Sequence, residues 1–275
     1  MIVKENSIML LKSTLIMLLL TLFIGCGSSG DKTDSTSPSN ILTTYYKAAL
    51  GKKGTDLKDA LHTIIYKSTY ISYKQAYNLL DIIDKDPKNS NNVILFYKQT
   101  PRLSNEKCHD SSQDCWNREH MWPKSLGVGY DDTISCYTDL HHLRPSDAIV
   151  NSDRGNKIYA TATTPYPKIP NFYWDTSASI WETSDNLKGN VARTMLYMIV
   201  RYEGDENEPD LELYAHDTSI SRPAELCMML HWNILDKVDE AEKRRNDLVE
   251  TYQKNRNPFI DNPEWAEDIW SKECR

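Results

Sequence analysis

Apolar residues recur at helical spacing in two segments, residues 55–66 and 72–83. Each segment starts with a hydroxyl residue, Thr55 in the first and Ser72 in the second, and such residues favour the N-cap position of a helix. The apolar positions that define the two faces are Leu57, Leu61, Ile64, Ile65, Tyr73, Ala76, Tyr77, Leu80 and Ile83. We therefore predict two helices that pack by these faces.

The middle of the chain changes from helical spacing to short apolar runs that are typical of strands. The run at residues 91–97 is bounded by polar residues and predicts a buried strand. Residues 137–143 suit another strand, Ser146 is a candidate cap for a short helix, and Gly155 is suited to end it. The order strand, loop, strand, helix is therefore expected across residues 116–155.

The C-terminal part of the chain is predicted to be mainly helical. Residues 190–202 are apolar on nearly every face but too few to cross a membrane, which favours a central buried helix. Further helices are expected at residues 224–235 and 238–253. We therefore expect an α+β fold that is mainly helical, in a single domain spanning residues 41–275.

The first 25 residues have the pattern of a signal peptide and are left out of this domain. Lys4 and Lys12 provide the positive region, and residues 13–24 form an apolar run shorter than the ~20 residues of a membrane span. The run ends in FIGC, which resembles the lipobox of bacterial lipoproteins and makes Cys26 the expected site of lipidation.

The polar, serine-rich residues 26–40 are expected to be a flexible tether between that lipid and the domain. Plain secretion is the alternative, because Phe23 stands where a lipobox usually has leucine. Either reading makes the protein extracytoplasmic, lipid-anchored in the cell envelope in the first case and secreted in the second. The lipid would be the only contact with a membrane.

Net charge and cysteine content narrow the classes of partner and site. The formal charge of −7 argues against nucleic-acid binding through a broad basic surface, although a small basic cleft remains compatible with it. The domain has five cysteines, so at least one thiol stays free if disulfides form after export. Cys108 and Cys115 are close enough in sequence to close a small loop, and the sequence leaves the other pairings open.

The residues with the clearest chemical potential are Glu119 and His120, which are adjacent. A neutral histidine can take a proton from water near neutral pH, so His120 is a candidate general base. Glu119 and Asn151 offer oxygen ligands, which suit a hard cation such as Mg²⁺ or, failing that, Mn²⁺ or Ca²⁺. Taken singly, a histidine is more often structural or exposed, Glu119 is better explained by an ion pair with Arg118 or Arg144, and Asn151 by capping a turn. The three residues therefore matter only together.

Four sequence blocks resemble the endonuclease I family of bacteria, periplasmic or secreted nonspecific nucleases with a ββα-metal (His-Me finger) core. They occur in the order found in that family and cover most of residues 115–270. The blocks are REHMWP, DLHHLRPSDAIVNSDRGN, NVARTMLYMIVRY and RRNDLVETYQKNRNPFIDNPEWAEDIW. The resemblance implies a metal-dependent endonuclease that hydrolyses phosphodiester bonds of DNA, with RNA left open as a second substrate.

The same resemblance implies roles for the three candidate residues. His120 would be the general base that activates water, and Glu119 and Asn151 would be the protein ligands of one divalent metal. Successive side chains on a strand point to opposite faces, so Glu119 and His120 can serve one phosphate only where the strand ends or bends. No protein partner is evident in the sequence.

Four further residues lie within the second of these blocks. Arg144 and Arg154 are candidates to hold substrate phosphate, and pairing with nearby aspartates is the alternative for each. We interpret His141 as a structural or second-layer residue and assign no role to His142.

Two other functions compete with that of a nuclease. His120, His141 and His142 could instead bind Zn²⁺ in a metallohydrolase, although the H-E-x-x-H motif is absent from the sequence. The chain could also be a lipoprotein that captures nucleic acid without cleaving it. Retention of Glu119, His120 and Asn151 together argues against that second alternative.

Overall fold

The two helices predicted near the start of the domain form where the apolar spacing places them. The first, α2, spans Gly54–Ile65 and begins before Thr55, so Thr55 is not its cap, and no side chain caps this helix. The second, α3, spans Tyr73–Ile83 and has Ser72 as its N-cap, as predicted. Ser72 forms a capping box with Gln75, in which each side chain bonds the backbone N–H of the other residue.

The computed structural model describes residues 43–109, 114–214 and 224–274, all within one compact unit, Pro38–Arg275. The signal peptide, the tether and Cys26 lie outside the described residues. Further α-helices are α4 (Ser135–Thr138), α5 (Ala148–Arg154), α6 (Asp185–Arg201), α7 (Leu226–Leu235), α8 (Glu240–Gln253), α9 (Pro258–Asp261) and α10 (Trp265–Trp270), and two short 3-10 helices span Lys124–Leu126 and Asp205–Asn207. The strands are β1 (Asn92–Leu95), β2 (Thr100–Leu103), β3 (Trp116–His120), β4 (Leu143–Asp147), β5 (Ile158–Tyr159), β6 (Thr164–Pro165), β7 (Tyr173–Asp175) and β8 (Ile180–Glu182).

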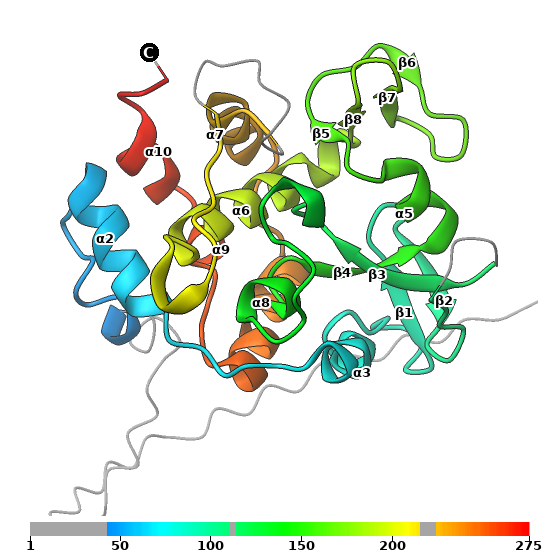
Figure 1. Cartoon of the computed structure of the whole chain (residues 1–275), viewed down its shortest axis with the longest axis horizontal. Coiled ribbons are helices and arrows are strands. Elements are labelled where there is room, and N and C mark those ends of the chain that lie inside the picture. The colour runs from blue at the N-terminus through cyan, green and yellow to red at the C-terminus, as the bar shows by residue number, and fades with distance from the viewer. Residues whose placement is uncertain (1–42, 110–113, 215–223, 275) are drawn as a thin grey trace, which may run out of the picture. The chain divides into compact units, whose positions relative to one another are not determined.

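Strands β3 and β4 form an antiparallel pair that leads directly into α5, which gives the ββα arrangement (Figure 1). The predicted order of strand, loop, strand and helix is therefore confirmed. Strand β1 pairs with β2 and lies against β4, while β5 to β8 form a separate small sheet in the order β5-β8-β7-β6. The expected α+β fold is confirmed, with a ββα core beside a larger helical part.

The boundaries of the second strand were predicted wrongly. Residues 135–138 form the short helix α4, and β4 starts only at Leu143, so it contains Pro145. The carbonyl of Pro145 points away from β3 and accepts a hydrogen bond of 2.8 Å from the backbone N–H of Phe96. Because N and O of one strand residue point the same way, the missing N–H of proline costs the β3–β4 ladder no bond.

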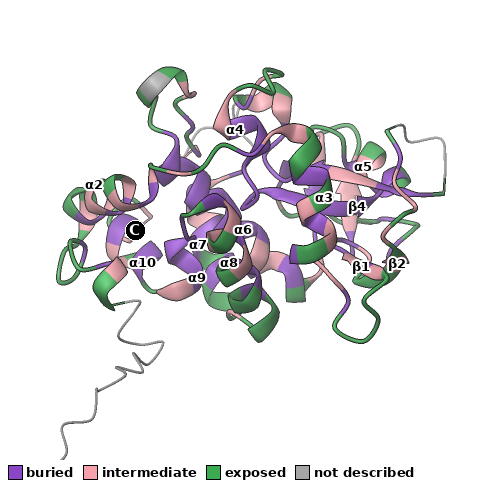
Figure 2. Cartoon of the chain, turned by 90° about the horizontal axis from the view of Figure 1, so that it is seen from below, coloured by how far each residue is buried: buried purple, intermediate pink, exposed green. Residues whose placement is uncertain are grey.

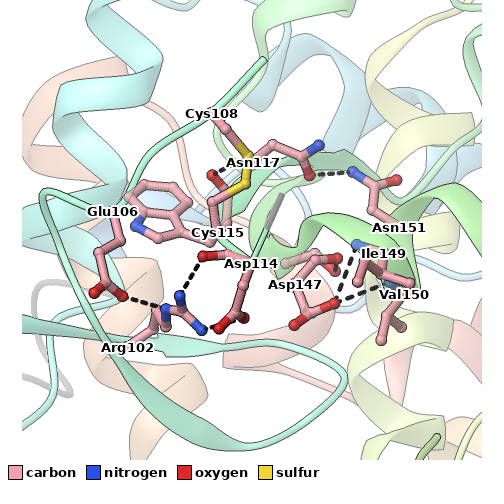
Figure 3. The surroundings of a disulfide bond; sticks show 12 residues. Arg102, Glu106, Cys108, Asp114, Cys115, Asn117, Asp147, Ile149, Val150 and Asn151 are labelled. Carbon is pink, nitrogen blue, oxygen red and sulfur yellow. Dashed lines mark hydrogen bonds and ion pairs between the residues drawn. A yellow bond between two sulfur atoms is a disulfide. The ribbon is translucent and has the colours of Figure 1, made fainter. Parts of the chain in front are cut away.

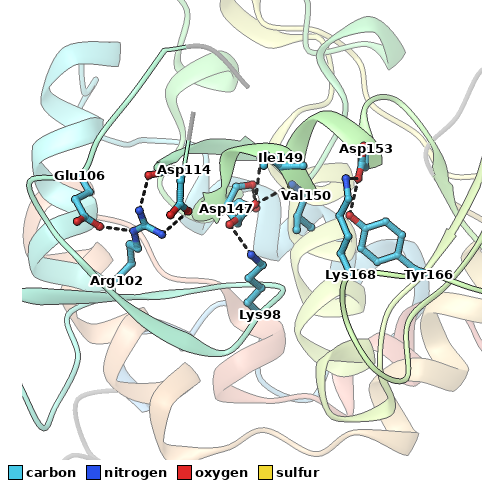
Figure 4. A network of polar contacts seen from close by, with 11 residues as sticks. Lys98, Arg102, Glu106, Asp114, Asp147, Ile149, Val150, Asp153, Tyr166 and Lys168 are labelled. Atoms are coloured by element: carbon cyan, nitrogen blue, oxygen red, sulfur yellow. Dashed lines mark hydrogen bonds and ion pairs between the residues drawn. The ribbon is translucent and has the colours of Figure 1, made fainter. Parts of the chain in front are cut away.

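The cap of α5 also differs from the prediction by one residue. Asp147, not Ser146, is the N-cap, and its carboxylate accepts bonds of 3.1 Å from the backbone N–H groups of Ile149 and Val150. Lys98 holds the same carboxylate at 2.6 Å, as Figure 4 shows. The helix ends at Gly155, as predicted, with φ at +57°.

A buried network fixes the turn that precedes β4. The carboxylate of Asp139 accepts hydrogen bonds of 2.7 Å from the hydroxyls of Tyr197 and Tyr202 on or next to α6. Its other oxygen accepts from Gln253 at the end of α8, at 2.8 Å. Arg245 of α8 donates to the carbonyl of Leu143 at 2.8 Å. The helical part therefore determines where β4 begins.

The predicted central helix forms as α6 and supplies much of the core, with its middle and C-terminal residues almost all buried (Figure 2). It packs against α2, α7 and α9. Arg193 crosses from α6 to α8, where its Nε donates to Glu242 at 2.9 Å. Within the described ranges, no helix combines the length and the apolar character that crossing a membrane requires.

Two disulfides close loops of different size. The bridge between Cys108 and Cys115 confirms the small loop expected ahead of β3 (Figure 3). A second bridge joins Cys227 of α7 to Cys274 near the C-terminus. Cys136 is buried and is the free thiol among the described cysteines.

Candidate active site

A cavity of about 390 Å³ lies where β3 ends and α5 begins. Glu119 and His120 reach it from the last two positions of β3, and Asn151 reaches it from α5. The three residues that the sequence singled out are therefore brought together. Trp122 and Pro123 lie outside β3, so the strand ends at His120. Two adjacent side chains can serve one site only where a strand ends or bends, and Glu119 and His120 meet this condition.

His120 is held in one orientation by the backbone. Its Nε2 lies 3.0 Å from the carbonyl oxygen of Tyr137, which can only accept, so Nε2 carries the hydrogen. Nδ1 is then the nitrogen with a free lone pair. Burial, reinforced by His142 and Lys124, holds the pKa of His120 well below its usual range, so the ring is neutral and able to take a proton.

Glu119 is 2% exposed and is held through one carboxylate oxygen. Its Oε1 accepts from the hydroxyl of Tyr97 at 2.7 Å and lies 3.3 Å from Nη1 of Arg154. Burial raises the pKa of this carboxyl, and the charge of Arg154 and the bond from Tyr97 oppose that rise. A cation in the cavity would oppose it further, because it would stabilise the charged form.

Asn151 presents a carbonyl oxygen as its remaining polar atom. Its Nδ2 donates both hydrogens, to Oδ1 of Asn117 at 2.7 Å and to the carbonyl of Arg118 at 3.1 Å. The backbone carbonyl can only accept, which fixes the orientation of the amide. Figure 3 shows Asn117 and Asn151 directed toward each other beside the Cys108–Cys115 disulfide. The oxygen Oδ1 of Asn151 is thus left as an acceptor in the residue that lines the cavity.

These donors fit a hard divalent cation. One carboxylate and one amide oxygen supply few protein ligands, an arrangement that Mg²⁺ completes with water and substrate oxygens. In residues 43–109, 114–214 and 224–274 there is no group of three or more His, Cys, Asp or Glu side chains placed to hold a metal.

The two arginines proposed to hold phosphate are not among the residues that line this cavity. Arg154 is fully buried, and its guanidinium donates to the carbonyls of His120 at 3.0 Å and Met121 at 2.6 Å. It braces the end of β3 rather than facing substrate. Arg144 lies opposite Glu119 in the strand register but lines a different cavity. We retain neither of them as a phosphate contact at this site.

The two neighbouring histidines are separated by the fold. Nε2 of His141 lies 3.2 Å from the carbonyl of Asn255, and its ring packs on Tyr197 with centroids 4.4 Å apart. His141 therefore belongs to the network of helical residues around Asp139. This position supports the interpretation of His141 as a structural residue. The ring of His142, by contrast, lies edge-on to His120 with centroids 5.3 Å apart. Of the pair, His142 adjoins the candidate base.

Two basic residues that line the cavity received no phosphate role from the sequence. The guanidinium of Arg118 lies 3.3 Å from the centroid of the Tyr73 ring. Lys124 follows β3 by four residues, and its Nζ lies 5.6 Å from the centroid of the Tyr137 ring. Among the described residues Lys124 forms no ion pair. Their position on either side of Glu119 and His120 in the sequence was the available signal.

Comparison of the sequence with those of known proteins identifies the family of this chain. The sequence model of the endonuclease I family matches residues 53–264. An extracellular ribonuclease of Bacillus amyloliquefaciens is 49% identical over 237 residues, covering 85% of this chain and 80% of that protein. An extracellular ribonuclease of Bacillus subtilis strain 168 is 45% identical over 249 residues, covering 90% and 85%. The chain belongs to the endonuclease I family and is a nuclease that hydrolyses phosphodiester bonds.

Proposed function

We propose that this protein is an extracytoplasmic endonuclease that cleaves DNA and RNA with His120 as general base and one hard divalent cation held by Glu119 and Asn151. The observation that carries the proposal is the convergence of these three side chains on one cavity, with Nε2 of His120 bonded to a backbone carbonyl. Relatives named ribonucleases support RNA as a substrate beside DNA. The chemistry is directed at the phosphate, which both nucleic acids share.

The reaction follows from the state of His120. Nδ1 takes a proton from the water that attacks phosphorus, and the imidazolium that forms keeps its Nε2–H bond to the carbonyl of Tyr137. The bond between phosphorus and the 3′ oxygen breaks as the new bond forms, and the leaving oxygen takes a proton from a second water molecule. When bound, the cation supplies positive charge to the phosphate oxygens that become more negative in the transition state. Arg118 and Lys124 add fixed positive charge at the same cavity, in a protein whose formal net charge is −7.

Plasmid DNA and a single-stranded RNA, each incubated with Mg²⁺ and with EDTA, test this assignment. The parent protein should degrade both nucleic acids with Mg²⁺ and neither in EDTA. His120→Ala should lose at least about 100-fold in rate, the order of a general-base contribution, and keep its circular dichroism spectrum. His231 is exposed on α7 and serves as the matched control, so His231→Ala should cut at the parent rate.

Each alternative predicts a different result in these assays. If His120→Ala cuts as fast as the parent, His120 is not the base. Peptide hydrolysis without nuclease activity would support the zinc metallohydrolase, and tight binding without cleavage would support a capture protein.

We further propose that Cys26 carries a lipid that tethers the nuclease domain to the cell envelope. The FIGC sequence after an apolar run supports this, and the word extracellular in the names of both relatives supports export. Cys26→Ser should move the protein from the membrane fraction of the producing cells to the medium or the periplasm. If the parent protein itself is found free in the medium, plain secretion is correct.

A further inference from the structure

A second cavity, of about 590 Å³, lies among α3, β1, β4, α6 and α8. It shares no lining residue with the cavity that holds His120. Its volume falls within the roughly 300–1,000 Å³ of small-molecule sites. Ile83, Ile94 and Leu187 contribute apolar walls, and charged side chains occupy other parts of the lining.

Arg144 is the unusual residue in this cavity. The residue is 3% exposed, and among the described residues its buried atoms Nε and Nη1 have no hydrogen-bond partner. Its guanidinium lies 5.5 Å from the centroid of the Phe96 ring, and no carboxylate of the described residues pairs with it. A buried guanidinium with unpaired donors lowers stability, because protein atoms do not replace the water it has lost. Such a group is suited to an anionic ligand.

The carboxylates around the cavity already have partners. Asp84 pairs with Arg245 at 2.8 Å. Glu242 pairs with Arg193 through Nε at 2.9 Å. The other acidic side chains each accept a backbone N–H, and their distances are 2.8 Å for Asp86, 2.9 Å for Asp236 and 2.8 Å for Asp239. Among the described residues, none of these carboxylates forms an ion pair with Arg144.

Carboxylate oxygens accept more than one hydrogen bond, so the same acids can also receive donors from a ligand. A ligand that fits must then combine an anionic group for Arg144 with hydroxyl or amino donors for the acids. It must also have an apolar face for the aliphatic walls. A phosphate group, a sugar and a base meet these three requirements in one small molecule.

We propose that this cavity binds a nucleoside monophosphate, with its phosphate on Arg144. Lys88 and Arg244, which are exposed at the same cavity, add positive charge at its rim. The choice of a nucleotide rests on the proposed function, since a nuclease encounters such molecules. Binding of a phosphate group by Arg144 does not depend on the proposed function. The same phosphate chemistry is present at the end of a nucleic-acid strand, so the test separates the two sources.

Isothermal titration calorimetry in EDTA, where the nuclease is inactive, tests the proposal. Thymidine 5′-monophosphate should bind the full protein, and a short oligonucleotide with a 5′-phosphate should bind more weakly because the cavity encloses its ligand. Arg144→Met should weaken mononucleotide binding about tenfold or more, the loss expected for a charged hydrogen bond of about 1.5 kcal/mol. Arg144→Lys, which keeps the charge, should retain measurable binding.

His120→Ala should bind the mononucleotide as the parent does, which separates this site from the catalytic cavity. A structural arginine would make Arg144→Met melt well below the parent, whereas a ligand-binding arginine leaves the melting temperature equal or higher without ligand. Unchanged binding in Arg144→Met, or a large fall in its melting temperature, would overturn the proposal. Equal binding of inorganic phosphate would overturn the choice of a nucleotide, and tighter binding of the oligonucleotide that is lost in Arg144→Met would assign the site to a strand end.

Discussion

At the residue scale, the cavity is organised by side chains that hold the reactive ones rather than by the reactive ones themselves. Tyr97 and Arg154 fix Glu119, Asn117 fixes Asn151, and the carbonyl of Tyr137 fixes His120. Each contact also sets an electronic property, such as the tautomer of the base or the charge on the carboxylate. Lys124 lines the same cavity and, like Arg118, forms no ion pair among the described residues.

Lys124→Gln should lower kcat/KM on DNA about tenfold, the effect of losing one charged contact worth about 1.5 kcal/mol. Binding of uncleaved DNA in EDTA should also depend less on salt, with the slope of log K against log salt reduced by about 0.9. Lys74 is exposed on α3, does not line the cavity and provides the control, so Lys74→Gln should change neither quantity. Equal salt slopes for Lys124→Gln and the parent would show that Lys124 does not hold a phosphate.

At the scale of elements, the ββα core depends on connections from outside it. The Cys108–Cys115 loop precedes β3, Arg245 of α8 holds the start of β4, and Lys98 supports the cap of α5. Figure 4 shows the loop held by a further link, in which Arg102 binds Glu106 and Asp114. The active geometry is therefore a property of how elements are joined and not of β3 alone.

The two disulfides should differ in their contributions to stability. They span 7 and 47 residues, and loop-closure entropy in the unfolded chain gives about 2.5 kcal/mol for the first and about 4 kcal/mol for the second. Replacing Cys227 and Cys274 by alanine should thus lower the free energy of unfolding by about 1.5 kcal/mol more than replacing Cys108 and Cys115. Urea denaturation of the two double variants measures the difference, and equal losses would contradict it.

At the scale of the whole molecule, stability should depend on pH through three buried histidines, one of which is His120, whose pKa lies well below its usual range. Burial lowers the pKa of both His141 and His142 to about 4. The unfolded chain, with a histidine pKa of roughly 6.5, binds protons in a range where the folded protein does not. Their contribution is therefore complete above about 6.5 and is lost as the pH falls toward about 4.

The free energy of unfolding should then fall by up to about 1.4 kcal/mol per pH unit for each histidine within this window. Urea denaturation at pH 7.0 and at pH 4.5 measures the fall. His142→Asn cannot bind this proton, so its stability should decrease less between the two pH values than that of the parent. An identical decrease in both proteins would show that His142 does not contribute.

The sequence by itself determined much of the local structure. Helical spacing located α2 and α3, and a short run that is apolar on nearly every face located α6. The cap at Ser72 was correct, and Gly155 ends α5 as expected. These features depend on residues a few positions apart, so the chain carries them locally. The candidate base and ligands were also found in the sequence, with the help of a family resemblance whose blocks lie in a fixed order.

Only the tertiary structure decided what depends on distant residues. The strand β4 begins later than predicted because α6 binds Asp139 and α8 binds Leu143. Both helices lie more than 50 residues further along the chain. Arg154 binds the backbone at the end of β3, and Arg144 lines a second cavity. The role of a guanidinium depends on the groups around it. The sequence specifies residue type and charge, but burial, hydrogen bonds and ion pairs arise only when the chain folds.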